Sequence, residues 1–383
     1  MKLLVLLPRF PYPLDKGDRL RAYHQIVELS RRHRITLCAL SHTPVGPEGH
    51  AALSAYCERI DVVRIGPVRA QLGVLEALLS GLPLQVGYFL STRATRQVEA
   101  LVDEVRPDRV LCQLVRTAEY AKRLTVPVSF DYMDAFSWRM KQRATVWSGL
   151  PASLLRMEAR RLARYEADLV GRFHSASIIS LQDREQIAHS ERERIGVVGN
   201  GVDFETFRPR DTPKQHDLLF VGNMAYPPNV LAAEQLVREV LPRVRREVPC
   251  RVLIAGASPS RRVRRLAGDG VTVTGWVDDI CASYASARVF VAPLSIGTGV
   301  QNKLLQAMAM AMPCVTSEPA RRGLGAGDDE VWVGSTPDEV AERTVSLLRH
   351  PQCAAALGQR GRAFALEHFH WSATATALEA LWA

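Results

Sequence analysis

Short hydrophobic runs alternate with longer amphipathic stretches along the whole chain. The runs are rich in Val, Ile and Leu, which predicts buried strands, and apolar residues recur at helical spacing between most of them. This alternation indicates parallel sheets covered by helices on both faces. The strand-like runs are KLLVLLP (2–8), RITLCAL (34–40), DVVRI (61–65), DRVLCQL (108–114), VSFDYM (128–133), HDLLFVGN (216–223), CRVLIAGA (250–257), VTVTGW (271–276), ARVFVAPL (287–294) and PCVTS (313–317).

The runs form two series, so the sequence predicts an α/β protein with two Rossmann-like, doubly wound domains facing each other across a cleft. The length of 383 residues, which exceeds one typical core, agrees with two domains. We expect an N-terminal domain over 1–208, a C-terminal domain over 209–365, and a last helix over 366–383 that crosses back to the first domain. The polar segment RPRDTPKQH (208–216) is the expected linker.

Composition narrows the class of protein only slightly. A hydrophobic content of 47% and a charged content of 23% are typical of globular proteins. The net charge of +9 comes almost entirely from arginine, because only six lysines occur. A compositional habit, phosphate-bearing substrates and an anionic membrane surface each explain this excess. Nucleic acid is disfavoured as a partner, since the arginines are spread out and no RNA-binding signature occurs.

Cysteine and histidine spacing indicates neither disulfides nor a metal site. The seven cysteines are scattered without any C-x-x-C pair, which predicts reduced thiols. The ten histidines lack the spacing of metal ligands, so we expect no metal. The first run is too short to span a membrane and is expected to be a buried strand.

The stretch LSIGTGVQNKLLQAMAMAMPCVTS (294–317) carries the strongest sign of chemistry. It places a glycine-containing loop before a helix expected to begin near Val300 or Gln301. Free N–H groups at a helix start favour anions, and Lys303 in the first turn adds a charge. Gln306 lies one turn further on, near the same end. The alternative is a buried helix whose few polar residues mark its wet end.

Other polar positions follow predicted strands, where ligands of parallel sheets bind. Gly222 and Asn223 follow one strand and could approach a phosphate, and Trp276 could flank a base or simply pack at the domain rim. Asp279 is expected to cap a helix rather than bind a metal. Asn229, after two prolines, is a plausible cap of a helix over 230–247.

In the first half, a loop around Gly17 precedes a helix and would allow close backbone approach to a ligand, or is an ordinary flexible loop. Asp18 and Arg19 follow it. Asp131 and Asp134 lie at the end of a strand, where either could orient a sugar hydroxyl or cap the next helix.

Taken together, these segments resemble glycosyltransferase family 4, a family with the GT-B fold, over essentially the whole chain. The segments that carry the resemblance are GNGVD (199–203), LLFVGN (218–223), VLIAG (252–256), VTVTGWVDD (271–279) and PLSIGTGVQNKLLQAMAMAMP (293–313). Four others resemble the sugar transferases associated with exosortase-type exopolysaccharide systems: PRFPYPLDKGDRLRAYH (8–24), SFDYMDAFSW (129–138), RMEARRLARYE (156–166) and YPPNV (226–230).

The resemblance implies a glycosyltransferase of the hexosyltransferase type that moves a sugar from a nucleoside-diphosphate sugar to a hydroxyl of a glycan or lipid-linked acceptor, with retention of configuration. It implies no tightly bound cofactor or metal. Gly17, Thr298 and Lys303 are the expected catalytic residues. The expected acceptor-side residues are Asp18, Arg19, Asp131 and Asp134. The expected donor-binding residues are Gly222, Asn223, Trp276, Ile296, Gly297, Gly299, Val300, Lys303 and Gln306.

The sequence departs from the family pattern at the donor side. Thr298 and Gln306 stand where glutamates are usual, and Asn223 with the following PPN turn replaces an Arg and a Lys. Lys303 is then the main cation for the diphosphate. A neutral glutamine in place of a charged partner of the ribose is expected to cost about 1 kcal/mol of binding.

Two other functions remain open at this point: a nucleotide-sugar epimerase of the same fold, and a non-catalytic binding or regulatory protein. We expect a cytoplasmic protein, or one held peripherally at the inner face of the plasma membrane. The segment over 68–97 mixes an apolar helix with flanking arginines, which is typical of a membrane surface contact and equally of an amphipathic core helix.

Overall fold

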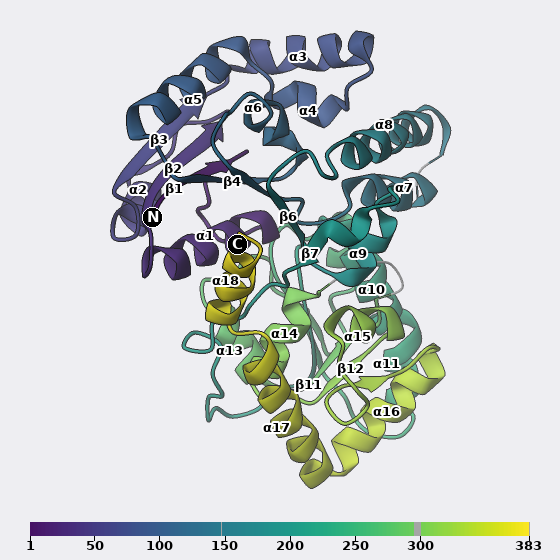
Figure 1. Ribbon diagram of the computed structural model, residues 1–383. Coiled ribbons are helices and arrows are strands. Elements are labelled where there is room, and N and C mark those ends of the chain that lie inside the picture. The colour runs from purple at the N-terminus through teal and green to yellow at the C-terminus, as the bar shows by residue number, and fades with distance from the viewer. Residues whose placement is uncertain (147, 295–299, 383) are drawn as a thin grey trace. The chain divides into compact units, whose positions relative to one another are not determined.

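The computed structural model describes residues 1–146, 148–294 and 300–382, and the chain divides into two compact units. Unit 1 comprises Met1–Asn200 with Trp371–Ala383, and unit 2 comprises Gly201–His370. Each unit contains its own parallel sheet with helices packed on it (Figure 1). The arrangement is therefore two Rossmann-like α/β domains, as the hydrophobic pattern predicts; that they face each other across a cleft stays a prediction.

The sheet of unit 1 has seven strands in the order β3-β2-β1-β4-β5-β6-β7, and each neighbouring pair is parallel. The order reverses between β1 and β4, which is the switch point of a doubly wound sheet. The strands are β1 (Lys2–Leu7), β2 (Arg34–Ser41), β3 (Arg59–Arg64), β4 (Arg109–Gln113), β5 (Val128–Asp131), β6 (Ser175–Ile178) and β7 (Ile195–Val197).

Helices cover both faces of this sheet, because alternate residues of β1 join different cores. Leu4 and Leu6 belong to one buried cluster, whereas Leu3, Val5 and Leu7 belong to another. The helices of unit 1 are α1 (Gly17–Ser30), α2 (Pro47–Ser54), α3 (Pro67–Ser80), α4 (Leu84–Phe89), α5 (Thr92–Val105), the 3₁₀ turn η1 (Val115–Thr117), α6 (Ala118–Ala121), α7 (Phe136–Val146), α8 (Gly149–Asp168), α9 (Leu181–Gln186), the 3₁₀ turn η2 (Arg192–Arg194) and α18 (Trp371–Ala380).

The C-terminal helix α18 packs on α1 within unit 1. The rings of Trp371 and His24 are stacked with centroids 4.8 Å apart. Leu378 and Trp382 lie in the same buried cluster as Ile26. This packing assigns the chain end to unit 1 from Trp371 onward, whereas the sequence suggested a change of domain at 365/366.

The sheet of unit 2 has six parallel strands in the order β10-β9-β8-β11-β12-β13. Its switch point lies between β8 and β11. The strands are β8 (His216–Val221), β9 (Val252–Ala255), β10 (Val271–Val273), β11 (Ala287–Ala292), β12 (Cys314–Thr316) and β13 (Trp332–Val333). The helices are α10 (Pro227–Gln235), the π-helical segment η3 (Leu236–Val240), α11 (Leu241–Arg245), α12 (Arg261–Arg264), α13 (Ile280–Ala285), α14 (Asn302–Ala309), α15 (Glu318–Leu324), α16 (Pro337–Arg349) and α17 (Pro351–His368).

Two local predictions are wrong. Gly17 is the first residue of α1 and not part of a preceding loop. Asn229 does not cap α10: the helix begins two residues earlier, at Pro227, with Tyr226 as its N-cap residue. Prolines in the first turn of a helix lack only an N–H that would have no partner there, so the helix can start on them. The helix expected over 230–247 is also interrupted by η3 before Pro242.

The cores are apolar and hold nearly all the cysteine thiols. All seven cysteines are free, and each is buried except Cys353. Burial raises the pKa of Cys38 and Cys112 to about 12, so these thiols stay protonated at neutral pH. Six of the seven thiols therefore pack in the cores, whereas Cys353 is exposed.

Candidate functional site

The switch point of unit 1 is flanked by two arginines. Arg9 follows the end of β1 and Arg116 lies in η1, just after β4. Open α/β sheets bind ligands beyond the carboxyl ends of their strands at this point. The topology therefore brings two guanidinium groups that are distant in sequence to the edge where a ligand is expected.

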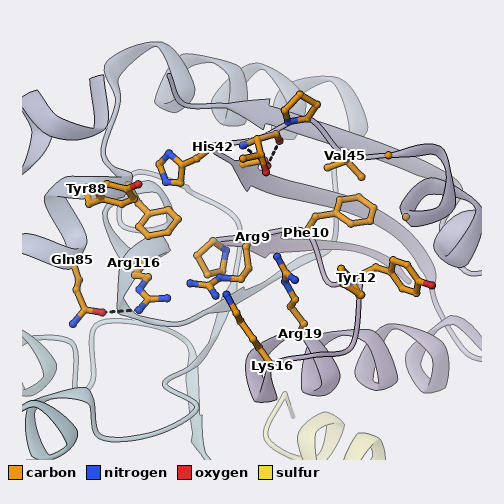
Figure 2. Close-up of a pocket in the computed structure, with 18 of the residues that line it drawn as sticks. Arg9, Phe10, Tyr12, Lys16, Arg19, His42, Val45, Gln85, Tyr88 and Arg116 are labelled. Atoms are coloured by element: carbon orange, nitrogen blue, oxygen red, sulfur yellow. Dashed lines mark hydrogen bonds between the residues drawn. The ribbon is translucent and has the colours of Figure 1, made fainter. Parts of the chain in front are cut away.

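A cavity of about 910 Å³ opens at this edge. Figure 2 shows the side chains of Arg9, Lys16, Arg19 and Arg116 gathered at one end of it. Its walls also include the aromatic residues Phe10, Tyr12, His42, Tyr88 and Phe89, with Glu48 as the carboxylate that lines it among the described residues. The volume lies in the usual range for small-molecule sites.

Arg116 is the most unusual of these cations. One Nη donates to Gln85 Oε1 at 2.6 Å, and Nε is buried without a hydrogen-bond partner. Its guanidinium carbon lies 5.5 Å and 4.9 Å from the ring centroids of Phe89 and Phe136. Within the described chain, no carboxylate forms an ion pair with it. Burial, together with repulsion from Arg9, lowers the pKa of Arg116 to about 10, so it is charged at neutral pH.

The residues expected around Gly17 lie beside this cavity. Asp18 forms an ion pair with Arg9 at 3.1 Å, and Arg19 forms one with Asp15 at 2.7 Å. Arg19 and Lys16 line the cavity, whereas Asp18 neutralises one of its cations. Asp18 and Arg19 thus lie at or beside one cavity, where the acidic residues form ion pairs with the basic ones.

Asp131 has a structural position and does not face the cavity. Its carboxylate is fully buried and pairs with the fully buried Arg21, with Nε and Oδ2 2.7 Å apart. Ser177 Oγ and the backbone N–H of Met133 donate to its other oxygen. Because these groups occupy both oxygens, the expected contact between Asp131 and an acceptor hydroxyl is not supported. Arg21 is likewise enclosed, donating also to Gly199 O at 3.0 Å.

Asp134 neither lines the cavity nor is as fully hydrogen-bonded as Asp131. One oxygen pairs with Arg139, and Oδ1 is buried without a hydrogen-bond partner. Its negative charge contributes to the raised pKa of Glu166, about 8, whose main cause is burial. It is not among the residues that line the cavity.

In unit 2, the switch point leads from β11 into the predicted donor loop and α14. Ile296, Gly297, Thr298 and Gly299 lie outside the described residues. Val300 is half-buried and packs on the core of unit 2. The helix begins at Asn302, with Gln301 as N-cap residue. Lys303 is therefore in the first turn, as predicted.

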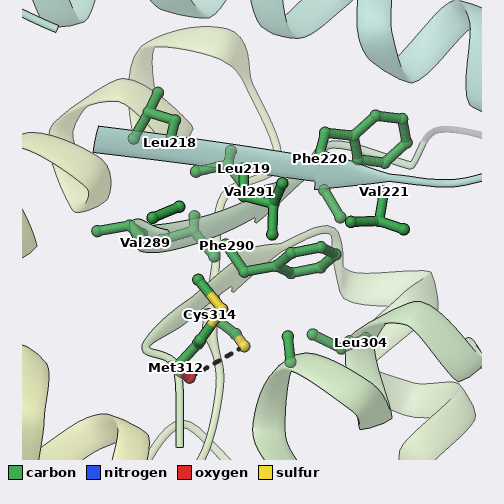
Figure 3. Packing of buried hydrophobic residues seen from close by; sticks show 14 of the residues in the cluster. Leu218, Leu219, Phe220, Val221, Val289, Phe290, Val291, Leu304, Met312 and Cys314 are labelled. Atoms are coloured by element: carbon green, nitrogen blue, oxygen red, sulfur yellow. Dashed lines mark hydrogen bonds between the residues drawn. The ribbon is translucent and has the colours of Figure 1, made fainter. Parts of the chain in front are cut away.

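Lys303 carries a half-buried ammonium group held by two amide side chains. Its Nζ donates to Asn229 Oδ1 at 2.9 Å and to Gln301 Oε1 at 3.3 Å, and it lies 5.9 Å from the centroid of the Phe220 ring. Figure 3 shows Phe220 and Leu304 of α14 among the residues of the buried cluster of unit 2, with Phe290 between them. No ion pair joins Lys303 to a carboxylate in the described part of the chain. Burial lowers its pKa to about 8.

Asn229 explains why Gly222 is a glycine. The buried Asn229 side chain donates to Asn223 O at 2.9 Å and lies over Gly222, where a Cβ atom would come within 2.7 Å of Nδ2. The backbone oxygen of Gly222 would also clash with a Cβ on Gly256. Close packing within unit 2 is thus sufficient to require Gly222. Asn223 itself is exposed, and its side chain accepts from the N–H of Ala225.

Gln306 lies one turn beyond Lys303 and is held by a tyrosine. The hydroxyl of Tyr284 is 3.1 Å from Gln306 Oε1 and 3.0 Å from Lys303 O. Tyr284 is fully buried, and burial raises its pKa well above the usual value, so it is a neutral donor. Lys303 and Gln306 therefore share one partly buried hydrogen-bonded cluster, which we call the α14 cluster: Asn229, Tyr284, Gln301, Lys303 and Gln306.

Trp276 lies apart from the α14 cluster in the strand order. It follows β10, the edge strand, whereas the cluster lies beyond β8 and β11. The side chain is 64% exposed, and Nε1 donates to Asp278 Oδ1 at 3.2 Å. Asp279 caps α13 through the N–H groups of Cys281 and Ala282, so the preference for a cap is confirmed.

Across the described ranges, no group of three or more His, Cys, Asp or Glu side chains could hold a metal ion. In the same part of the chain, no helix is long and apolar enough to cross a bilayer.

Three important side chains were missed by sequence reasoning: Gln85, Arg116 and Asn229 as a partner of Lys303. Arg116 had a weak signal, since it lies two residues after a predicted buried strand. Gln85 and Asn229 had none, because their partners are 31 and 74 residues away along the chain.

Comparison with known proteins gives a family only for part of unit 2. Residues 215–350, about a third of the chain, match the family model described as "Glycosyl transferases group 1". This segment contains β8, α10, β11 and α14, and thus the whole α14 cluster. No curated protein matches the sequence.

Solved structures match over nearly the full length at low identity. Sucrose-phosphate synthase from Thermosynechococcus elongatus has a TM-score of 0.70 and 16% identity, covering 100% of this chain and 98% of that one. HepE from Anabaena, solved with UDP-glucose, has a TM-score of 0.69 and 14% identity, covering 99% of each chain. A protein from Listeria monocytogenes described as a UDP-N-acetylglucosamine 2-epimerase has a TM-score of 0.58 and 11% identity, covering 98% of this chain and 94% of that one. The chain therefore has the pair of Rossmann-like domains of the GT-B fold, and its residues 215–350 are similar to group 1 glycosyl transferases.

Proposed function

We propose that this protein is a glycosyltransferase that moves a sugar from a nucleoside-diphosphate sugar to a hydroxyl group, with the donor bound by unit 2 and the acceptor by unit 1. The α14 cluster carries the proposal. It lies in the segment that matches group 1 glycosyl transferases, and it holds an ammonium group that has no carboxylate partner among the described residues. A diphosphate would supply the missing negative charge.

In the reaction, the bond between the anomeric carbon and the diphosphate oxygen breaks, and the acceptor oxygen bonds to that carbon. The acceptor proton is released, and negative charge develops on the leaving diphosphate. Lys303 and the N–H groups at the start of α14 would stabilise this charge, an electrostatic contribution fixed in advance by the fold. Gln306 would contact the nucleoside ribose, and Gly222, Asn223, Trp276 and the segment 296–300 complete the proposed donor side.

On the acceptor side we propose Arg19 together with Lys16, and Asp18 as the partner that orients Arg9. Gly17 and Thr298 are proposed to approach the reacting groups. Retention of configuration, hexosyl specificity and a role in exopolysaccharide synthesis are supported by the resemblance of the sequence. HepE, solved with UDP-glucose, makes that compound the first donor to test.

A peripheral position at the inner face of the plasma membrane is supported by α3. Its outer face exposes Val68, Leu72, Leu75 and Leu79 at helical spacing. Its inner face packs closely on α4, where a Cβ on Gly73 would meet the backbone oxygen of Gly87 at 2.1 Å. Flotation with liposomes at low and high salt tests this position, and absence of binding under both conditions would contradict it.

A transfer assay with Lys303→Ala tests the proposed function. The donor is first chosen by a thermal-shift screen of nucleoside diphosphates and their sugars, since a ligand at 100 times its dissociation constant adds about 2.7 kcal/mol of stability. We expect the variant to lower turnover at least about ten-fold, which is about 1.4 kcal/mol of barrier. The control is Lys214→Ala, which removes the other lysine of unit 2. Unchanged turnover of Lys303→Ala would remove this residue from the mechanism.

A nucleotide-sugar epimerase is the second candidate, because the same fold occurs in the Listeria protein. Incubation with the donor alone separates the two reactions. An epimerase changes the sugar while the nucleotide stays attached, whereas a glycosyltransferase releases the nucleoside diphosphate only when an acceptor is present.

A further inference from the structure

The cavity of unit 1 contains more positive charge than a hydroxyl acceptor requires. Arg9 and Arg19 each have a carboxylate partner. Lys16 and Arg116 have none among the described residues, although both line the cavity. Sugar hydroxyls are usually held by neutral or acidic groups. Lys16 is exposed, so the sign of an anionic ligand is the half-buried Arg116, with Lys16 as a second cation at the same cavity.

Arg116 is also prepared for such a ligand. Its guanidinium plane is held by Gln85 and by the rings of Phe89 and Phe136, while its Nε–H has no partner. Arg116 is half-buried, and a cation withdrawn from water without a counter-ion destabilises a fold unless a ligand supplies the charge. Arginine presents its donors in a fork that matches phosphate oxygens, and its position is fixed before binding.

The rest of the cavity fits the uncharged part of a phosphorylated sugar. Tyr88, His42 and Phe89 form a packed aromatic group, with the His42 and Tyr88 ring centroids 4.4 Å apart. Aromatic faces of this kind pack against the C–H groups of sugars. Val74 of α3 also lines the cavity, so its wall continues into the helix whose outer face is apolar.

We propose that the cavity of unit 1 binds the phosphate or diphosphate group of a phosphorylated acceptor, with Arg116 and Lys16 as its ligands. That the ligand is an acceptor of sugar transfer rests on the proposed function. The presence of an anion site in the cavity does not depend on that function. The acceptor is then a sugar phosphate ester, either free in water or attached through its diphosphate to a lipid.

The first experiment measures binding of inorganic diphosphate by calorimetry. If the protein binds UDP, saturating UDP is added so that the proposed donor site of unit 2 is occupied. The full-length wild type is compared with Arg116→Met and Lys16→Met. The matched control is Arg123→Met, which removes an exposed arginine of the same unit. We expect at least ten-fold weaker binding for Arg116→Met, several-fold weaker binding for Lys16→Met, and wild-type binding for Arg123→Met. The proposal would be overturned if Arg116→Met bound diphosphate as tightly as the wild type. It would also be overturned if this variant lost affinity for UDP and kept its affinity for diphosphate.

The second experiment separates the two sources of phosphate. Transfer is measured to a sugar 1-phosphate, to a short-chain lipid diphosphate sugar, and to an octyl glycoside without phosphate. We expect Arg116→Met to raise KM at least ten-fold for whichever phosphorylated acceptor is used, with KM for the octyl glycoside and for the donor unchanged. An equal rise for the octyl glycoside would contradict phosphate recognition. If no transfer occurs at all, the proposed function fails, while the binding result still decides on the anion site.

Discussion

At the switch point of each sheet, a cation contacts an amide side chain and an aromatic ring, but the cation differs between the two units. In unit 1, Arg116 follows β4, is held by Gln85 and lies over Phe89. In unit 2, Lys303 follows β11, is held by Asn229 and lies over Phe220. Each is a buried or half-buried cation that touches an amide and an aromatic ring, without a carboxylate partner among the described residues. A carboxylate would stabilise either cation, and this shared arrangement supports our two proposals that a ligand anion takes that place.

The difference between the two sites lies in the character of the cation. Guanidinium stays charged, because burial lowers the pKa of Arg116 only to about 10. The ammonium of Lys303, with a pKa lowered by burial to about 8, is close to losing its proton. Affinity at the α14 cluster should therefore depend on pH near neutrality, whereas affinity at the unit 1 cavity should not.

Arg21, in contrast, is a fully buried cation with a carboxylate partner, and it gives the largest expected effect. Its partner Asp131 is fully buried, so Asp131→Asn leaves Arg21 enclosed without its counter-ion. We expect a loss of about 3–5 kcal/mol in the free energy of unfolding, measured by urea denaturation. The double variant Arg21→Met with Asp131→Leu should recover part of this loss. A loss below about 1 kcal/mol for Asp131→Asn would show that Arg21 does not need its carboxylate partner for stability, which contradicts the contrast with Arg116 and Lys303.

Lys303→Met should behave in the reverse way. Below pH about 8, the ammonium is disfavoured in the folded chain, so removing it should leave the free energy of unfolding unchanged or raise it. Between pH 8 and 10.5, the unfolded chain binds the proton that the folded chain has lost, and wild-type stability therefore rises with pH.

Urea denaturation of wild type and Lys303→Met at several pH values between 7 and 10.5 measures this difference. The wild type is expected to gain stability relative to the variant across that window. A flat difference, or one of opposite sign, would show that Lys303 is not a desolvated ammonium.

The smallest expected effect is that of Gln306→Glu. Tyr284 donates to Gln306 Oε1 and can donate equally to a carboxylate. A charged partner for a ribose hydroxyl should tighten donor binding several-fold, or about 1 kcal/mol. The dissociation constant of the nucleoside diphosphate, with Arg123→Met as control, checks this. Tight donor binding with no transfer by either the wild type or Gln306→Glu would favour a non-catalytic binding protein.

The fold follows from the sequence because its signals are local. The apolar runs within residues 2–8 and 216–223 predict buried strands of a covered sheet, and both form central strands. The two-residue strand β13 (Trp332–Val333) is too short to leave such a pattern. Lys303 was predicted for a similar reason: it is a single charge in the first turn of an apolar helix.

The partners of the charged residues could not be predicted, because they depend on long-range packing. Asp131 and Asp134 are three residues apart, yet one is fully enclosed by Arg21 and the other pairs with Arg139. Arg116 is one of many arginines, and only the position of Gln85 and the two phenylalanine rings distinguishes it. A single sequence carries no local sign of such contacts.

Calorimetric titration with the tightest-binding nucleoside diphosphate tests the central claim most directly. The wild type, Lys303→Met and Arg116→Met are compared at pH 7. At least about ten-fold weaker binding is expected for Lys303→Met, equivalent to about 1.4 kcal/mol, with Arg116→Met within about two-fold of the wild type. Wild-type affinity in Lys303→Met would contradict the assignment of the α14 cluster as the seat of the donor diphosphate.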